Sequence, residues 1–473
     1  MTIRLMKNEQ SNIHPSDKPI LMFLVFGIIS LGIRLYFNFS QDLIPGINGG
    51  YYPLQVRYVL TNGHLGFPDM PLIFYLDAIL IKFVSLFGVP ITDTLIMNVV
   101  KIIDSISIPL LLIPIYKIFR LSKPTTYKYF STSIIAFSVL SFSPLILKSD
   151  LQKNAVAIVF LFASVSYFLS YLSKKNKKDI YMSILFFLLI GITHFGTFAF
   201  ALVFMIIAIA FSYKQKAIIP LVILTIFSLA IVAIFDFSRF IRLTSFWTEL
   251  FNKPALLSNL LAPPDLILIL ISLLLAGFGL FILKTKGFRL DPYQKAIAFS
   301  SVICLFLLSF PLLDTEYFKR LSLFLFIPQI ILIIQIAPVL DIPHLRIISF
   351  SLIVITFLSV FAVIGKPADA VLDKGAYENL KELTTIIKND NETIIIARHG
   401  LEWWAAWVLK TKVGQDKSID KAFFEKYRNI IFLTQINGFG NDRQRTPFHE
   451  PIAPPNSEVI FSSEYFKAYK LIH

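Results

Sequence analysis

Long apolar runs separated by short polar segments dominate the chain, and they predict helices that cross a membrane. One crossing takes about 20 apolar residues, and eleven runs reach or approach this length. The runs are 19–39, 93–118, 128–147, 152–172, 180–193, 197–213, 217–236, 264–283, 293–312, 320–338 and 345–364. The pattern therefore predicts an all-α, multi-pass integral membrane protein with about 11 transmembrane helices.

A further apolar run, 71–88, contains Asp77 and Lys82 and is either a surface helix or another span. If it lies along the outer surface, most basic loops share a side with the N-terminal tail 1–18. If it spans, the basic segment SKKNKKD falls outside. The positive-inside rule favours the surface helix. It then predicts a cytoplasmic N-terminus, a first outer loop at 40–92 and an extracytoplasmic C-terminus.

The composition changes at Lys366, after which apolar runs shorten and charged residues become more frequent. The expected elements are a helix at 373–389, the strand TIIIAR, the helix GLEWWAAWVLK, a helix near 418–427 and the strand NIIFLTQ. This alternation indicates a small α/β domain at 366–473, outside the membrane, after a transmembrane domain at 19–365. No G-x-G-x-x-G or P-loop motif is present in the sequence, so a nucleotide site is unsupported.

The net charge of +14 also reflects the membrane. Acidic and basic residues nearly balance after Lys366, so the excess lies in the transmembrane part. We attribute it to topology and lipid headgroups, and we expect no nucleic-acid partner. The single cysteine, Cys304, excludes an internal disulfide and a cysteine metal cluster, and we expect a buried thiol.

Polar residues collect at the outer ends of the helices under this topology. They are Asp42, Asp69, Asp77, Asp93, Asp150, Asp236, Asp265, Asp314 and Glu316, with Arg57, His64, Lys148, Lys153, His194, Lys319 and Arg320. Lys and Arg at this face would bind an anionic lipid headgroup, and a carboxylate would accept the proton of a reacting hydroxyl.

Several short motifs between residues 19 and 364 strengthen this interpretation. They are Arg34, PGINGGYYPLQVRYVLTNG, FPDMPLIFYLDA, NVVKIIDSISIPLLLIPIYKIFR, LKSDLQKNAV, ITHFG and EYFKRLSLFLFIP. The set resembles the GT-C superfamily of integral-membrane glycosyltransferases, of the polyprenyl-phosphate-dependent type that includes mannosyl- and aminoarabinosyltransferases. The resemblance implies surface helices in the first outer loop, a sugar donor on polyprenyl phosphate and often a soluble outer C-terminal domain.

In that superfamily the first outer loop usually carries an acid before a surface helix that contains Tyr and Arg. Matching the R-x-x-L-x-x-G spacing of Arg57–Gly63 places the acid on Asn48. An amide does not accept a proton at neutral pH, so Asn48 is not the base. Three alternatives remain: Asp42 takes the role, Asp69 takes it, or the chain is catalytically weak or silent. Asp69 lies between prolines in FPDMP, which would fix its backbone, but it also suits a turn that caps the following helix.

The other candidates each have a structural alternative. The pair Gly49-Gly50 suits close approach to a headgroup or a plain turn. Tyr51 and Tyr52 suit sugar stacking or the aromatic belt at the membrane interface. Arg57 suits a phosphate or a solvated helix face.

Five later residues and a tryptophan pair complete the set. Lys148, Asp150 and Lys153 would hold a phosphate or only end two helices, and Arg320 is a phosphate candidate because ionisable groups at such depth usually have a partner. His194 would bind a ligand or close a turn. Trp403 and Trp407 share a helix face and favour packing over glycan binding.

The predicted function is transfer of a sugar, hexosyl or pentosyl, from a polyprenyl-phosphate-linked donor to a membrane lipid, glycan or protein acceptor on the outer face. The sequence leaves a divalent-metal requirement open, because it shows no clear ligand cluster, and we name no metal ligands. A transporter or flippase would show broken helices at midplane and an inverted repeat, and the sequence shows neither. A multi-span transporter or flippase, a polysaccharide polymerase or ligase, and a non-catalytic sugar-lipid binding protein remain alternatives.

Overall fold

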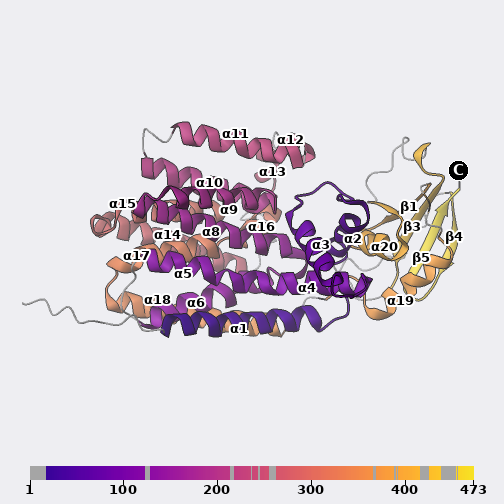
Figure 1. The fold of residues 1–473 in the computed structure, drawn as a ribbon, viewed down its shortest axis with the longest axis horizontal. Coiled ribbons are helices and arrows are strands. Elements are labelled where there is room, and N and C mark those ends of the chain that lie inside the picture. The colour runs from indigo at the N-terminus through magenta and orange to yellow at the C-terminus, as the bar shows by residue number, and fades with distance from the viewer. Residues whose placement is uncertain are drawn as a thin grey trace, which may run out of the picture.

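A bundle of long helices lies beside a small sheet domain in the computed structural model (Figure 1). The structure describes residues 18–122, 128–213, 218–235, 237–242, 245–254, 263–365, 369–387, 390, 392–415, 425–437, 454 and 456–472.

Within these residues, seven helices or continuous helix pairs are long and apolar enough to cross a membrane. They are α1 (Lys18–Phe39), α4 (Asp93–Leu110) with α5 (Leu112–Leu121), α6 (Lys128–Leu140) with α7 (Phe142–Ile146), α8 (Gln152–Lys174), α10 (Phe195–Tyr213), α14 (Pro263–Thr285) and α18 (Ile342–Ile364). An eighth span arises if α16 (Thr315–Ser322) and α17 (Phe326–Ile336), which are bent by 47° at their junction, count as one.

The predicted count of 11 spans is therefore too high by this measure. The runs 180–193, 217–236 and 293–312 form α9 (Lys177–Gly191), α11 (Ile218–Phe235) and α15 (Pro292–Leu308). A helix rises about 1.5 Å per residue, so these helices are shorter than the roughly 30 Å hydrocarbon core. The remaining short helices are α12 (Phe237–Arg242) and α13 (Phe246–Leu250), with 3₁₀ turns at Ser149–Leu151, Gly287–Arg289, Ala337–Val339 and Leu383–Thr385.

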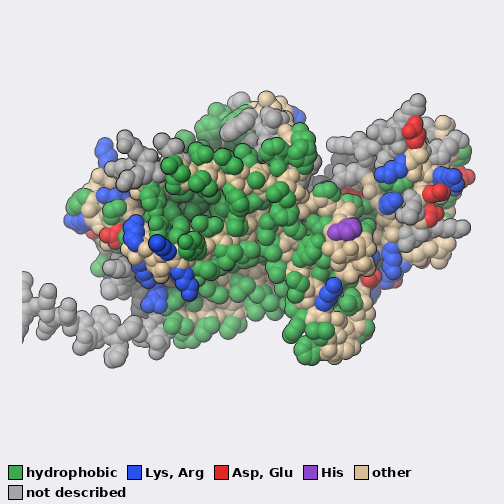
Figure 2. Space-filling view, turned by 45° about the horizontal axis from the view of Figure 1, so that its top comes forward, with side chains coloured by type: hydrophobic (Ala, Val, Ile, Leu, Met, Phe, Trp, Pro, Cys, Tyr) green, Lys and Arg blue, Asp and Glu red, His purple; other side chains and the backbone are tan. Residues whose placement is uncertain are grey.

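The basic segments predicted to share one side of the membrane meet in the structure. The Lys286 ammonium lies 2.7 Å from the Asp341 carboxylate, and the Gln294 side chain donates to the Ser122 carbonyl at 3.1 Å. Figure 2 shows hydrophobic side chains over the flank of the bundle and Lys and Arg gathered at its end away from the sheet domain. Three of the basic segments predicted on one side thus contact one another. The alternation of the helices across the membrane, and which end faces the cytoplasm, stay predictions.

Two helices of the loop that follows α1, α2 (Tyr51–Asn62) and α3 (Leu72–Ser85), lie between the bundle and the sheet domain (Figure 1). With 14 residues, α3 is about 21 Å long and is not a candidate span. The Leu72 N–H donates to the Ile192 carbonyl at 3.0 Å, so α3 begins against the turn between α9 and α10.

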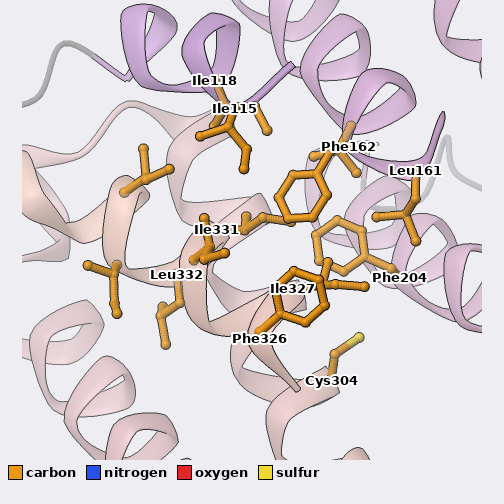
Figure 3. Close-up of a cluster of buried hydrophobic side chains, with 14 of the residues drawn as sticks. Ile115, Ile118, Leu161, Phe162, Phe204, Cys304, Phe326, Ile327, Ile331 and Leu332 are labelled. Atoms are coloured by element: carbon orange, nitrogen blue, oxygen red, sulfur yellow. The ribbon is translucent and has the colours of Figure 1, made fainter. Parts of the chain in front are cut away.

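The core of the bundle is continuous and apolar. Figure 3 shows Ile115, Phe162, Phe204 and Ile331, from four different helices, packed together near Cys304. Cys304 is buried and unoxidised, which confirms the predicted core thiol. Such dense burial gives the outer ends of the helices a rigid base.

The sheet domain contains α19 (Lys374–Glu382), α20 (Leu401–Leu409) and the strands β1 (Thr393–Ala397), β2 (Lys412–Gln415), β3 (Asn429–Gln435), β4 (Ser457–Ser462) and β5 (Phe466–Leu471). The strand order is β2-β1-β3-β5-β4, with β1 parallel to β2 and β3, and β5 antiparallel to β3 and β4. The predicted strands TIIIAR and NIIFLTQ and the helix between them are confirmed. The hairpin β4–β5 was not predicted. Most of the predicted helix near 418–427 lies outside the described residues.

Candidate functional site

Asp69 is the centre of a buried polar cluster at the end of the bundle next to the sheet domain. Its side chain is 4% exposed. Oδ2 accepts a hydrogen bond from the Tyr51 hydroxyl at 2.6 Å and pairs with the Lys153 ammonium, and Oδ1 accepts from the Met70 N–H at 2.7 Å. We call Asp69, Tyr51 and Lys153 the Asp69 cluster.

Gln55 holds the loop that carries Asp69 against α2. Its Nε2 donates to the Tyr51 hydroxyl and to the Phe67 carbonyl, both at 2.9 Å. Its Oε1 accepts from the N–H groups of Gly66 at 2.9 Å and Phe67 at 3.2 Å. Sequence reasoning missed this residue. The sequence did contain a sign of its role, because Gln55 is an amide one turn after Tyr51 on a helix with many apolar positions. A buried amide needs several hydrogen-bond partners.

Aromatic rings enclose the Tyr51 side chain on two sides. Its ring centroid lies 4.9 Å from Trp403 of α20 and 5.7 Å from Phe74 of α3, both edge-to-face. Burial, followed by the charge of Asp69 and its hydrogen bond, raises the pKa of Tyr51 well above its ordinary value. Tyr51 therefore stays a neutral hydrogen-bond donor to Asp69, and the sheet domain supplies one wall of the cluster.

Lys153 reaches the cluster from the first turn of α8. Its ammonium lies 5.4 Å from the Tyr51 ring centroid and 5.5 Å from the Phe74 centroid. Its backbone N–H donates to the Tyr52 hydroxyl at 3.4 Å, and the Tyr52 side chain is buried. The structure thus brings together four of the predicted site residues: Asp69, Tyr51, Tyr52 and Lys153.

Lys148 lies five residues before Lys153, in the loop between α7 and α8. Its side chain is buried, its ammonium stands 3.1 Å from the Phe37 ring centroid, and it has no hydrogen-bond partner among the described residues. Burial and the charge of Arg34, opposed by Asp104, lower the pKa of Lys148 to about 7. The side chain of Asp150 lies outside the described part of the chain.

A buried ionic network fixes the backbone beside Lys148. Arg34 Nη2 lies 3.0 Å from Asp104 Oδ1 and donates to the Leu147 carbonyl at 2.9 Å. Asp104 Oδ2 accepts from the Ser149 N–H at 3.0 Å, and Ser149 has a left-handed backbone with φ of 59°. This conformation is uncommon for serine, and the network holds it in place.

The glycine-rich loop of residues 44–50, which we call the docking loop, contacts the sheet domain. A Cβ on Gly50 would lie 2.9 Å from the Trp404 ring and 3.0 Å from its backbone nitrogen, and one on Gly400 would lie 3.0 Å from the Ile47 carbonyl oxygen. The close approach suggested by the glycines is therefore made to protein backbone. The carbonyl of Asn48 accepts from the Tyr51 N–H at 3.0 Å, at the start of α2.

Arg57 lies on α2 and also joins the two domains. Its guanidinium stacks 3.4 Å above the Trp407 ring, donates to the Trp407 carbonyl at 2.5 Å and lies 2.9 Å from the Asp93 carboxylate. Trp407 is fully buried, in agreement with the packing role favoured for the tryptophans. The contacts of Arg57 are thus with the sheet domain and with Asp93 at the start of α4, rather than with the Asp69 cluster.

Asp42 and Arg320 also lie in other surroundings. Asp42 is 77% exposed, lies 3.7 Å from the Lys374 ammonium and borders a cavity of about 360 Å³ at the junction with the sheet domain. Arg320 is 75% exposed, lies 3.7 Å from Glu316 and lines a cavity of about 220 Å³ that is otherwise mostly acidic.

His194 caps α10. Its Nδ1 accepts from the Thr197 N–H at 3.1 Å and lies 2.9 Å from the Thr197 hydroxyl, which leaves Nδ1 unprotonated. Across the described residues, no group of three or more His, Cys, Asp and Glu side chains is arranged to hold a metal. We therefore derive no step through a metal ion.

No protein-family model matches the sequence, and no curated protein matches it either. Solved structures do. The chain is similar to the oligosaccharyltransferase of Archaeoglobus fulgidus in the apo form, with 8% identity, a TM-score of 0.61 and coverage of 89% of this chain and 70% of that one. The same organism's AglB, in complex with an inhibitory peptide and a dolichol-phosphate, gives 10% identity, a TM-score of 0.55 and coverage of 88% and 70%.

ArnT from Cupriavidus metallidurans bound to undecaprenyl phosphate shows 10% identity over 96% of this chain and 98% of that one, with a TM-score of 0.39. The likeness in fold rests on the oligosaccharyltransferase structures. They show that the chain shares the fold of the archaeal oligosaccharyltransferase.

Proposed function

We propose that this chain is an integral-membrane glycosyltransferase that moves a hexosyl or pentosyl group from a polyprenyl-phosphate carrier to a hydroxyl of a lipid, glycan or protein at the outer face. The observation that carries the proposal is the Asp69 cluster, which places a buried carboxylate and a lysine together at one end of a GT-C bundle. The similar AglB structure holds a dolichol-phosphate, which supports a lipid phosphate as the carrier.

The reaction needs a base and a cation. The acceptor oxygen attacks the anomeric carbon of the sugar, and its proton passes to the Asp69 carboxylate. The bond between the anomeric carbon and the phosphate oxygen breaks, and its electron pair leaves on the polyprenyl phosphate. A carboxylate near the hydroxyl and ammonium groups near the phosphate stabilise this transition state.

Lys153 and Lys148 are the favoured phosphate ligands. Lys153 is already beside the proposed base, and Lys148 has a buried ammonium without a hydrogen-bond partner in the described structure. Phosphate oxygens are strong acceptors for such donors. Arg57 and Arg320 stay predictions as phosphate ligands, and their contacts with Asp93 and Glu316 favour other roles.

The decisive experiment measures release of free polyprenyl phosphate by the purified full-length protein. The protein receives a panel of polyprenyl-phosphate sugars with a membrane-glycan extract as acceptor. Release with one donor establishes the reaction and identifies the sugar. Tight donor binding without release from any donor favours the second candidate, a non-catalytic sugar-lipid binding protein, which the amide at Asn48 supports.

A further inference from the structure

The proposed base and the nearest proposed phosphate ligand are bound to each other. Lys153 pairs with Oδ2 of Asp69, and both side chains are largely buried, with 13% and 4% exposure. The same oxygen also accepts the Tyr51 hydroxyl, and the other oxygen accepts the Met70 N–H. An adjacent cation stabilises the charged form of a carboxylate and so weakens its affinity for a proton. In this arrangement Asp69 is a poor base.

We propose that the donor phosphate competes with Asp69 for Lys153, so that donor binding releases the carboxylate to act as the base. The inference rests on the proposed function and adds its regulation. In the empty protein Lys153 masks Asp69. When an anionic phosphate binds, the ammonium moves to the phosphate oxygens and Asp69 keeps its hydrogen bonds from Tyr51 and Met70.

The surroundings of Lys153 suit an exchange of partners. Its four-carbon stem is flexible and its ammonium is a compact charge with no fixed direction. The ammonium lies beside the Tyr51 and Phe74 rings, more than 5 Å from either centroid, so two aromatic side chains flank it. Tyr51, by contrast, is held by Gln55 and two rings, and it stays with Asp69.

The buried ammonium of Lys148 would also favour binding of the donor phosphate. Its ammonium is buried five residues before Lys153 and lacks a hydrogen-bond partner among the described residues. A phosphate that reached both lysines would supply that partner, and this gain would offset the loss of the Lys153–Asp69 pair. Such an exchange makes the Asp69 carboxylate available as a proton acceptor only when the sugar donor is bound. A sugar acceptor that binds before the donor is therefore not deprotonated.

The test is a double-mutant cycle on the affinity of the full-length protein for sugar-free polyprenyl phosphate, measured by equilibrium binding in detergent micelles. Asp69→Asn removes the competitor, so we expect binding roughly tenfold tighter than in the wild type, or about 1.4 kcal/mol. Lys153→Met weakens binding, and the double variant binds as weakly as Lys153→Met alone. The double variant lacks both charges of the pair, so neither is left buried without its partner. If Lys153→Met fails to fold, the double variant therefore serves as the protein without Lys153 in this comparison.

The outcomes separate the inference from the function on which it rests. No binding by the wild type overturns the lipid-linked donor itself. Binding that is unchanged or weaker in Asp69→Asn overturns the exchange and leaves the donor intact. Equal tightening with and without Lys153 means that Asp69 only repels the phosphate, and this also overturns the exchange.

Discussion

The docking loop and Asp69 belong to the same loop after α1, yet different interactions hold their surroundings together. The docking loop packs its backbone against that of the sheet domain, and Gly50 leaves no room for a Cβ beside Trp404. In the Asp69 cluster two charged side chains, from the FPDMP segment and α8, meet the neutral Tyr51 hydroxyl of α2. The docking loop therefore joins the two domains, whereas the FPDMP segment after α2 places Asp69 beside Tyr51 and Lys153.

The largest expected effect is on turnover, and it distinguishes Asp69 from a carboxylate near the docking loop. Asp69→Asn removes the proposed base and should lower turnover by about a hundredfold to ten-thousandfold, and the unpaired Lys153 that it leaves should also lower the thermal unfolding temperature. Asp42→Asn, at an exposed carboxylate near the docking loop, is the matched comparison. The release assay checks both variants. Equal losses would move the base, or part of its role, to Asp42, and unchanged turnover in Asp69→Asn would remove Asp69 from the mechanism.

The next prediction concerns Arg57, which lies in the chain between the docking loop and Asp69. Arg57→Met removes the stacking on Trp407, the bond to its carbonyl and the pair with Asp93. We expect a loss of about 2–3 kcal/mol in the free energy of unfolding, seen as earlier thermal unfolding, with unchanged affinity for polyprenyl phosphate. Weaker lipid binding at unchanged stability would restore Arg57 as a phosphate ligand.

A glycine substitution in the docking loop should affect assembly alone. Gly50→Ala places a Cβ against the backbone of Trp404 and should cost about 1–3 kcal/mol of stability. The control is Gly32→Ala in α1, where a Cβ meets nothing within 4 Å and the change should stay within about 0.5 kcal/mol. Thermal unfolding measures both. A Gly50→Ala protein of normal stability with weakened donor binding would make this loop part of the site.

The smallest expected effect is a pH dependence from Lys148. Its pKa is lowered to about 7, so it loses its charge as the pH rises through 7, well below the ordinary range of a lysine. If it binds the donor phosphate, kcat/KM for the donor falls several-fold above pH 7, because this ratio reports the free enzyme. Lys148→Arg keeps its charge and should remove that fall. A profile identical to that of the wild type would dissociate Lys148 from the phosphate.

Part of the candidate site was accessible from the sequence. The flanking prolines drew attention to Asp69, and the outer-side lysines drew attention to Lys148 and Lys153. Their chain positions 69, 148 and 153 did not show that Asp69 and Lys153 form a pair. Arg57 fitted the motif pattern equally well, and only its contacts with Trp407 and Asp93 favour a structural role.

The sequence by itself determined the membrane class and the small α/β domain, because apolar length, charge distribution and β-branched runs are local properties of the chain. The parallel pairing of β1 with β2 and β3 came from the structure. By length and composition the described helices provide fewer spans than the sequence predicted, because an apolar run does not reveal where its helix ends. Only the tertiary structure decided which charges meet. The partner of a buried charge depends on how segments distant in the chain pack together, which the sequence alone does not show. Asp69 is paired with Lys153 for that reason, while Gly50 of the same loop contacts the sheet domain.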